Sequence, residues 1–281
     1  AQGGSRLLYT RYAETGSPAL AQMVFDGAGW LPLPLERATA RITPEGSKVA
    51  DDPFPRMAYF GAARERLAVR LIDVAQSERV AGRELQGANF VPGEPAMLAT
   101  AAVGEEGERQ VFRWDYRDNT ITQVTDDTAV KLRSPEPWAV PELGGETAFA
   151  VLARLGGQLF VRLYARNAEG AFEVYADVFS PDAAKPYLRS PRPFVYDGVS
   201  YLVFRTQPAP GEDLANDIWV VNADPDPAQR LYRRLNVDGD VRRADQEPVI
   251  TASGPVVYYS ELVSGAPKRT RRCRTGIAPV P

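Results

Sequence analysis

The feature that most constrains this chain is that its two ends carry the same unit. Residues 7–27, LLYTRYAETGSPALAQMVFDG, align without gaps to residues 256–276, VVYYSELVSGAPKRTRRCRTG. Each segment has a β-branched or aromatic stretch, a Gly-Ser-Pro or Gly-Ala-Pro turn and a second stretch, which is the pattern of a β-hairpin. Units of this kind bury their apolar faces against neighbouring copies, so the sequence favours a repeat architecture whose two end hairpins meet and close a ring.

A second recurrence is a proline that opens an apolar strand. It is found at five places along the chain: Phe54-Pro55, Glu94-Pro95, Glu136-Pro137, Arg192-Pro193 and Glu247-Pro248. The spacings run from about 40 to about 56 residues, which overlaps the length of a propeller blade of three or four strands. Proline fits at such an opening because the first residue of a strand can lack a hydrogen-bond donor without loss.

The clearest single unit lies in residues 193–236. Its apolar segments predict four strands, at 194–196, 201–204, 218–221 and 230–232. The preceding unit repeats the order, at 138–140, 148–152, 159–164 and 172–175. No segment shows an apolar stripe of period 3.6, so almost no helix is expected. The sequence therefore predicts an all-β fold: a single β-propeller domain spanning residues 1–281, with about six blades of three to four antiparallel strands or, alternatively, five blades.

Composition narrows the chemistry. The chain has no histidine, which removes the usual base near pH 7, the Ser-His-Asp and Cys-His arrangements and every metal site that uses histidine. Its net charge of -3 gives no general electrostatic attraction to nucleic acid or to an anionic membrane. No stretch approaches the roughly 20 apolar residues that span a bilayer. We therefore expect no cofactor, no metal, no nucleic-acid partner and no membrane insertion.

One stretch resembles a known family. Residues 216–224, NDIWVVNAD, are similar to the third-strand signature of propellers like the carboxy-terminal domain of the TolB translocation protein, whose repeats carry an Ile-Trp-x-x-Asn-x-Asp core. The resemblance implies a propeller fold and a periplasmic location, and it implies no activity. The start of the sequence, Ala1-Gln2-Gly3-Gly4, fits a mature exported product, so an extracellular or periplasmic location is expected.

A weaker resemblance is to the five-bladed glycosidase propellers. The phrase FVYDGVSYLVF at residues 194–204 is common there, and Asp52-Pro53 matches the Asp-Pro of their blade openings. Histidine, which is found in many such sites, is absent from this chain. If the chain is an enzyme of this kind, Asp52, Glu136 and Glu247 are the candidates for acid, base or nucleophile, because paired carboxylates can hydrolyse glycosides without histidine.

The candidate binding site follows from the fold. Because the innermost strands of a propeller start near one end of its channel, charged residues that flank the openings should converge on one face. The candidate ligand-binding residues are Arg56, Arg133, Glu136, Arg189, Arg192, Tyr196, Arg243 and Glu247. Two interpretations stay open: the alternating charges satisfy one another as structural ion pairs, or the forked arginines hold a polar ligand against an apolar wall of Tyr196 or Trp138.

Two functions are carried forward. The first is an exported, non-enzymatic propeller that binds a partner protein or a saccharide through one face of the ring, with no catalytic residues. The alternative is a carbohydrate-active enzyme that uses paired carboxylates at the mouth of the channel. A map of which charged residues are paired would distinguish them, since an isolated carboxylate pair favours the enzyme and a fully paired ring favours the scaffold.

Overall fold

The chain is built from β-strands. The computed structural model describes residues 6–12, 16–35, 41–46, 56–61, 66–72, 74–104, 107–210, 214–236, 241–263 and 267–277. In this part of the chain the other regular elements are two short 3-10 turns, η1 (Pro141–Leu143) and η2 (Pro227–Gln229). None of the helical segments in these ranges is long and apolar enough to cross a membrane.

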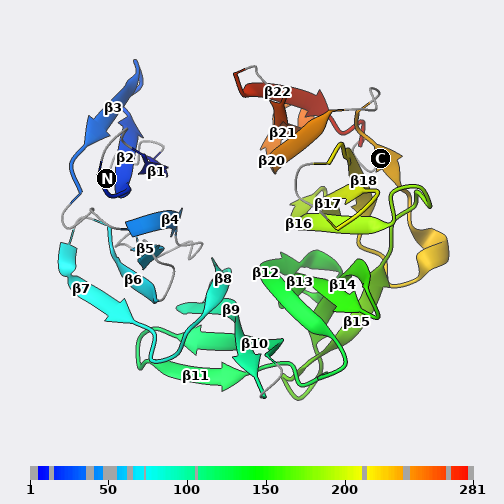
Figure 1. The fold of residues 1–281 in the computed structure, drawn as a ribbon, viewed down its shortest axis with the longest axis horizontal. Helices are drawn as coiled ribbons and strands as arrows, with labels where there is room; N and C mark the ends of the chain where they lie inside the picture. The colour runs from blue at the N-terminus through cyan, green and yellow to red at the C-terminus, as the bar shows by residue number, and fades with distance from the viewer. Residues whose placement is uncertain are drawn as a thin grey trace. The chain divides into compact units, whose positions relative to one another are not determined.

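The strands form six small sheets in which consecutive strands are neighbours (Figure 1). The first three sheets comprise β1 (Arg6–Arg11), β2 (Ala19–Phe25) and β3 (Trp30–Leu33); β4 (Arg41–Gly46), β5 (Arg56–Gly61), β6 (Leu67–Leu71) and β7 (Val74–Val80); and β8 (Gln86–Phe90), β9 (Ala96–Val103), β10 (Glu108–Asp115) and β11 (Thr120–Gln123). The last three comprise β12 (Lys131–Val140), β13 (Glu146–Leu155), β14 (Gln158–Arg166) and β15 (Phe172–Val178); β16 (Tyr187–Tyr196), β17 (Val199–Gln207), β18 (Asp217–Asn222) and β19 (Arg233–Arg234); and β20 (Arg242–Thr251), β21 (Gly254–Leu262) and β22 (Arg269–Arg274).

The fold class is the one that the repeats predict, an all-β propeller with six blades of three or four antiparallel strands. The two predicted end hairpins are present, as the β1–β2 pair and the β21–β22 pair. The chain divides into two compact units, Ala1–Ala101 with Val111–Gln123 and Ala102–Gln110 with Val124–Pro281. That the chain is a single domain, and that its end hairpins meet to close one ring, stay predictions.

The unit at residues 193–236 was predicted correctly except for its last strand. Strands β16, β17 and β18 contain the first three predicted segments, but the fourth strand is Arg233–Arg234 rather than 230–232. Arg230 explains the difference. It is buried, and its guanidinium donates hydrogen bonds to the carbonyl oxygens of Asp224 at 2.8 Å and Pro225 at 3.1 Å. Because these bonds tie residue 230 to the turn before it, pairing with β18 starts only after it.

A β-bulge recurs in the first strand of five sheets. In each, the first strand advances three residues while its partner advances two, so one extra residue is inserted. The residue that begins each bulge has a positive φ between 49° and 58°: Thr43, Gly87, Ser134, Ser190 and Asp245. Because side chains alternate along a strand, the extra residue brings positions three apart, such as Arg133 and Glu136, to the same face of the sheet.

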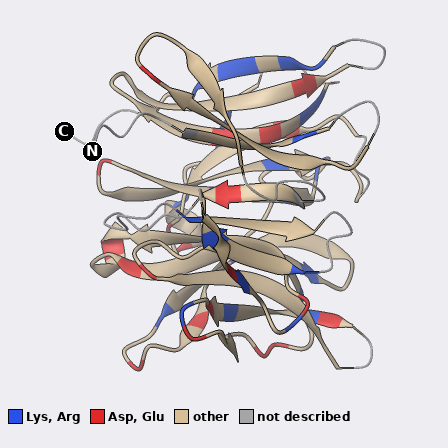
Figure 2. Cartoon of the chain, turned by 90° about the vertical axis from the view of Figure 1, so that its left-hand side faces the viewer, with Lys and Arg blue, Asp and Glu red and all other residues tan. Residues whose placement is uncertain are grey.

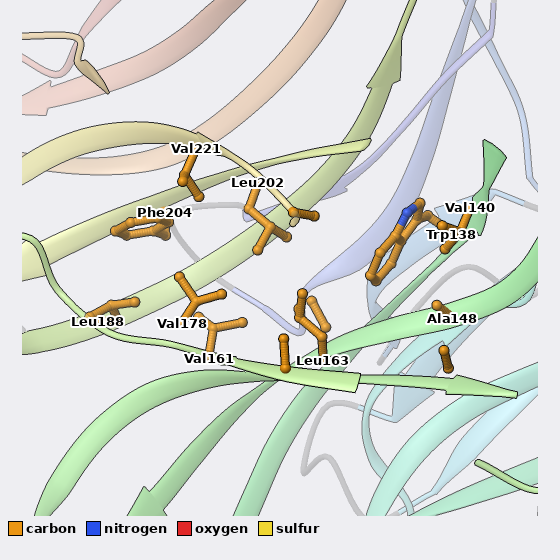
Figure 3. Close-up of a cluster of buried hydrophobic side chains, with 14 residues drawn as sticks. Trp138, Val140, Ala148, Val161, Leu163, Val178, Leu188, Leu202, Phe204 and Val221 are labelled. Carbon is orange, nitrogen blue, oxygen red and sulfur yellow. The ribbon is translucent and has the colours of Figure 1, made fainter. Parts of the chain in front are cut away.

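Apolar packing joins two sheets of the second unit. Fourteen buried residues form a cluster between the β12–β15 sheet and the β16–β19 sheet. Figure 3 shows their side chains pointing toward one another, with Val161, Leu163 and Val178 on one side and Leu202, Phe204 and Val221 on the other. Leu202 and Phe204 are completely buried, and burying a side chain of this size contributes about 1.5–3 kcal/mol. This cluster holds β12 and β16 in fixed positions.

Substitution of Ser134 tests the bulge. A left-handed φ costs a β-branched residue more than serine and costs glycine least. We expect Ser134→Val to lower the free energy of unfolding by about 1–3 kcal/mol and Ser134→Gly to leave it unchanged or raise it by up to about 1 kcal/mol. Urea denaturation measures both. Ser17 is a matched control because it is exposed, also precedes a proline and lacks a positive φ; a similar loss in Ser17→Val would contradict the interpretation.

Candidate functional site

Three of the candidate residues occupy matching positions. Glu136 in β12, Arg192 in β16 and Glu247 in β20 are each the first residue that pairs with the next strand after the bulge. The proline that follows each of them was the sequence signal, but the prediction that it opens a strand was wrong, because each of these prolines lies inside its strand, after the bulge. The pairs at 54–55 and 94–95 differ, because Glu94 lies in the turn before β9, a second strand, and Phe54-Pro55 lies outside the described residues.

One guanidinium connects the three sheets. The Nη1 atom of Arg192 donates a hydrogen bond to the carboxylate of Glu136, and its Nε atom lies 3.1 Å from Oε1 of Glu247. The exposed fraction of the side chain is 8% for Glu136, 34% for Arg192 and 58% for Glu247. The network therefore runs from a buried carboxylate to a carboxylate that faces solvent, with an arginine shared between them. We call Glu136, Arg192 and Glu247 the charge triad.

Arg189 and Arg243 lie near the bulges but bind the backbone. Arg243 is completely buried, and its Nη1 atom donates to the carbonyl oxygens of Asn216 at 2.7 Å and Val241 at 3.1 Å. Arg189 is half-buried and donates to the carbonyl oxygen of Pro210. In this structure both guanidiniums hold loops in place, so neither carries the binding proposal below.

The sequence reasoning missed a polar network that holds the bulges of β16 and β20. Arg205 in β17 donates to the hydroxyl of Ser190 at 2.8 Å and to the carbonyl oxygen of Arg243. Gln246 in β20 donates to the carbonyl oxygen of Ser190. These partly buried bonds fasten the irregular backbone beside Arg192 and Glu247. No residue pattern marked Arg205, because its partners are distant in sequence and meet it only through the bulges.

The proposed apolar wall is part of the packing. Trp138 is 5% exposed, and its indole N–H donates to the hydroxyl of Ser200 at 3.1 Å. Tyr196 is half-buried and packs against an apolar cluster that includes Phe194 and Val257. Arg133 is exposed at the start of the β12 bulge. Of these three residues, Arg133 is the one with an exposed side chain.

Two candidates lie elsewhere. Arg56 begins β5, in the first unit, where its guanidinium lies 5.7 Å from the centroid of the Tyr116 ring. Asp52 lies outside the described residues, so the structure gives no position for it.

Basic and acidic segments are scattered over the sheets that face the viewer in Figure 2. In the part of the chain that the structure describes, no group of three or more acidic or cysteine side chains could hold a metal ion. Cys273 is partly buried against the apolar cluster that includes Phe194 and Val257, and this burial raises the pKa of its thiol. A raised pKa makes the thiol a poorer nucleophile, so packing is the better account of Cys273.

Comparison with known proteins agrees with this architecture. No family model and no curated protein matches the sequence. The crystal structure of TolB from Acinetobacter baumannii superposes with a TM-score of 0.59 at 16% sequence identity, covering 96% of this chain and 64% of the TolB chain. The fold is that of a TolB-like propeller. This chain spans less than two thirds of the length of that TolB chain, and identity at this level shows the fold alone.

Other propellers superpose nearly as well. A structure from a study of two prolyl endopeptidases gives a TM-score of 0.55 at 11% identity, covering all of this chain and 41% of that one. The Trypanosoma rangeli sialidase, solved as a covalent intermediate with 2,3-difluorosialic acid, gives 0.55 at 10% identity, covering 98% of this chain and 53% of the sialidase. The sialidase agrees with the weaker glycosidase resemblance at the level of fold. Function therefore has to be argued from the charge triad itself.

The charge triad predicts two different stability effects. Arg192→Ala leaves the buried Glu136 without its guanidinium partner, so we expect the free energy of unfolding to fall by about 1–3 kcal/mol. Glu247→Ala removes an exposed partner and should cost less than about 1 kcal/mol. Urea denaturation of both variants checks this, with Glu146→Ala, an exposed strand glutamate of the same unit, as the control. Equal losses for Arg192→Ala and Glu247→Ala would contradict the assignment.

Proposed function

We propose that this protein is an exported, non-enzymatic propeller that binds a partner protein or a saccharide through the face on which the charge triad lies. The first strands of propeller blades line the central channel, so charged residues at matching positions of three blades face the same mouth. The observation that carries the proposal is that Glu247 is more than half exposed while its guanidinium partner is held by a buried carboxylate.

A low entropy cost favours binding of a ligand by Arg192 and Glu247. Glu136 fixes the guanidinium of Arg192 in one orientation, so binding would cost little side-chain entropy there. Glu247 offers an exposed carboxylate beside the guanidinium of Arg192. A polar surface that presents a cation or hydroxyl groups would complement this pair of charges. Export is supported by the propeller fold shared with TolB; fractionation of the source cells tests it.

A retention experiment tests the binding proposal. The immobilised full chain is exposed to a soluble extract of the source cells and to an array of glycans, and the molecules retained are identified. We expect at least one protein or glycan to be retained by the wild type and by Glu146→Ala, and to bind at least about tenfold more weakly to Glu247→Ala, because losing one charged hydrogen bond costs about 1.5–3 kcal/mol. Arg192→Lys should weaken the binding of the same molecule, because lysine keeps the positive charge but loses the forked hydrogen-bond geometry of the guanidinium.

The outcome of this experiment separates the two partner classes. A protein that depends on Glu247 identifies a protein partner, and a glycan that does so identifies a saccharide. If nothing retained by the wild type is weakened in Glu247→Ala, the charge triad is internal scaffolding and the proposal is wrong.

The enzyme alternative makes an opposite prediction. A glycosidase of the retaining or inverting kind needs one carboxyl group that holds a proton and one that is ionised. In this structure Glu136 and Glu247 both pair with Arg192, so one cation is shared by the two carboxyl groups. We therefore expect aryl glycosides to be left intact. Turnover of any of them that Glu136→Gln or Glu247→Gln abolishes would replace the binding proposal by the enzyme.

A further inference from the structure

The first unit contains a pocket that the sequence reasoning did not find. Its volume is about 410 Å³, within the range of small-molecule sites. Three elements line it: Arg56 at the start of β5, residues 76–79 of β7, and Tyr116 with Arg117 directly after β10. The pocket therefore lies between the β4–β7 sheet and the β8–β11 sheet, within one compact unit.

The lining of this pocket is rich in arginine. Arg56, Arg79 and Arg117 reach it from three separate segments, and Glu78 is the carboxylate residue that joins them there. Glu78 also accepts a hydrogen bond from the hydroxyl of Tyr59. Among the residues that the structure describes, the lining thus carries three positive charges and one negative charge, although the whole chain has a net charge of -3. Such an excess favours an anion.

Two of these arginines have donors to offer. Arg117 is 69% exposed, and its Nη2 atom lies 3.6 Å from Oδ2 of Asp115, beyond hydrogen-bond distance; Arg113 lies 3.6 Å from the same oxygen. Arg79 is exposed, and none of the described residues forms an ion pair with it. Guanidiniums with open N–H groups bind carboxylate and phosphate oxygens in a forked geometry.

The third arginine is held in place. Arg56 is half-buried, with its guanidinium facing the buried Tyr116 ring at 5.7 Å. A cation fixed on an aromatic face loses little freedom when a ligand binds it. The exposed side chain of Gln76 adds an amide that can bond hydroxyl groups.

We infer that this pocket binds the anionic group of a small polar molecule, a carboxylate or a phosphate carried on a body about the size of a monosaccharide. The arginines take the anionic group, and Gln76 and Glu78 take hydroxyl groups of the body. The inference goes beyond the proposed function, because these residues lie in the unit that does not contain the charge triad.

Calorimetric titration of the full chain tests the inference. The probes are glucuronate, glucose 6-phosphate and glucose, at low ionic strength. We expect at least one of the two acids to bind and glucose to give no heat; the acid that binds identifies the anionic group. Arg79→Ala and Arg117→Ala should each lower the affinity for that acid by about tenfold or more, because each removes a charge-assisted hydrogen bond. Both residues are exposed, so thermal melting should be unchanged.

The control is Arg154→Ala, which removes an exposed arginine from β13 in the other unit. It should leave the titration unchanged, and so should Glu247→Ala, which separates this inference from the proposed function. Failure of both acids to bind more tightly than glucose would overturn the inference. So would equal weakening by Arg154→Ala, because that result would show a general charge effect instead of a site.

Discussion

The structure depends on one left-handed residue in the first strand of each of five sheets. This residue inserts a bulge, and the bulge changes which side chains share a face. Without it, Arg133 and Glu136 would point to opposite faces of their sheet, as residues three apart do in a regular strand. Because the same change occurs in β16 and β20, the residues after the bulge are presented in the same way in three successive sheets. The charge triad is a consequence of this repetition.

Apolar packing and the charge triad contribute differently to the structure: packing supplies stability, and the triad favours one alignment of the strands. Leu202 and Phe204 are completely buried between sheets, and side chains of this kind each contribute about 1.5–3 kcal/mol. A partly exposed ion pair such as that of Arg192 with Glu247 contributes about 0–1 kcal/mol. Packing therefore determines how stable the second unit is. The charges favour one relative position of the strands β12, β16 and β20, because the guanidinium of Arg192 can pair with both carboxylates only when these strands are aligned.

The repeats in the sequence were enough to predict the propeller class, because alternating apolar segments and turn residues are local signals. They were not enough to predict the last strand of the 193–236 unit. Arg230 is buried there and bonds a backbone carbonyl group, and the apolar periodicity of the sequence does not indicate such a bond. The charge triad was found through the prolines that follow its members. Arg79 and Arg117 were missed, because β7 and the end of β10 approach each other only through the packing of two sheets.

Propellers that superpose on this chain include TolB, a prolyl endopeptidase and a sialidase, so the fold leaves both binding and catalysis open. We propose that the arrangement of charges separates them. Hydrolysis of a glycoside by paired carboxylates needs a carboxyl group that can give up a proton next to one that is ionised, and such a pair arises when the two environments differ. Glu136 and Glu247 do differ in burial, but they share Arg192, and the cation compensates the buried carboxylate most directly. A site in which the buried acid is the better compensated one is suited to holding a charge in place, which is what recognition of a polar partner requires.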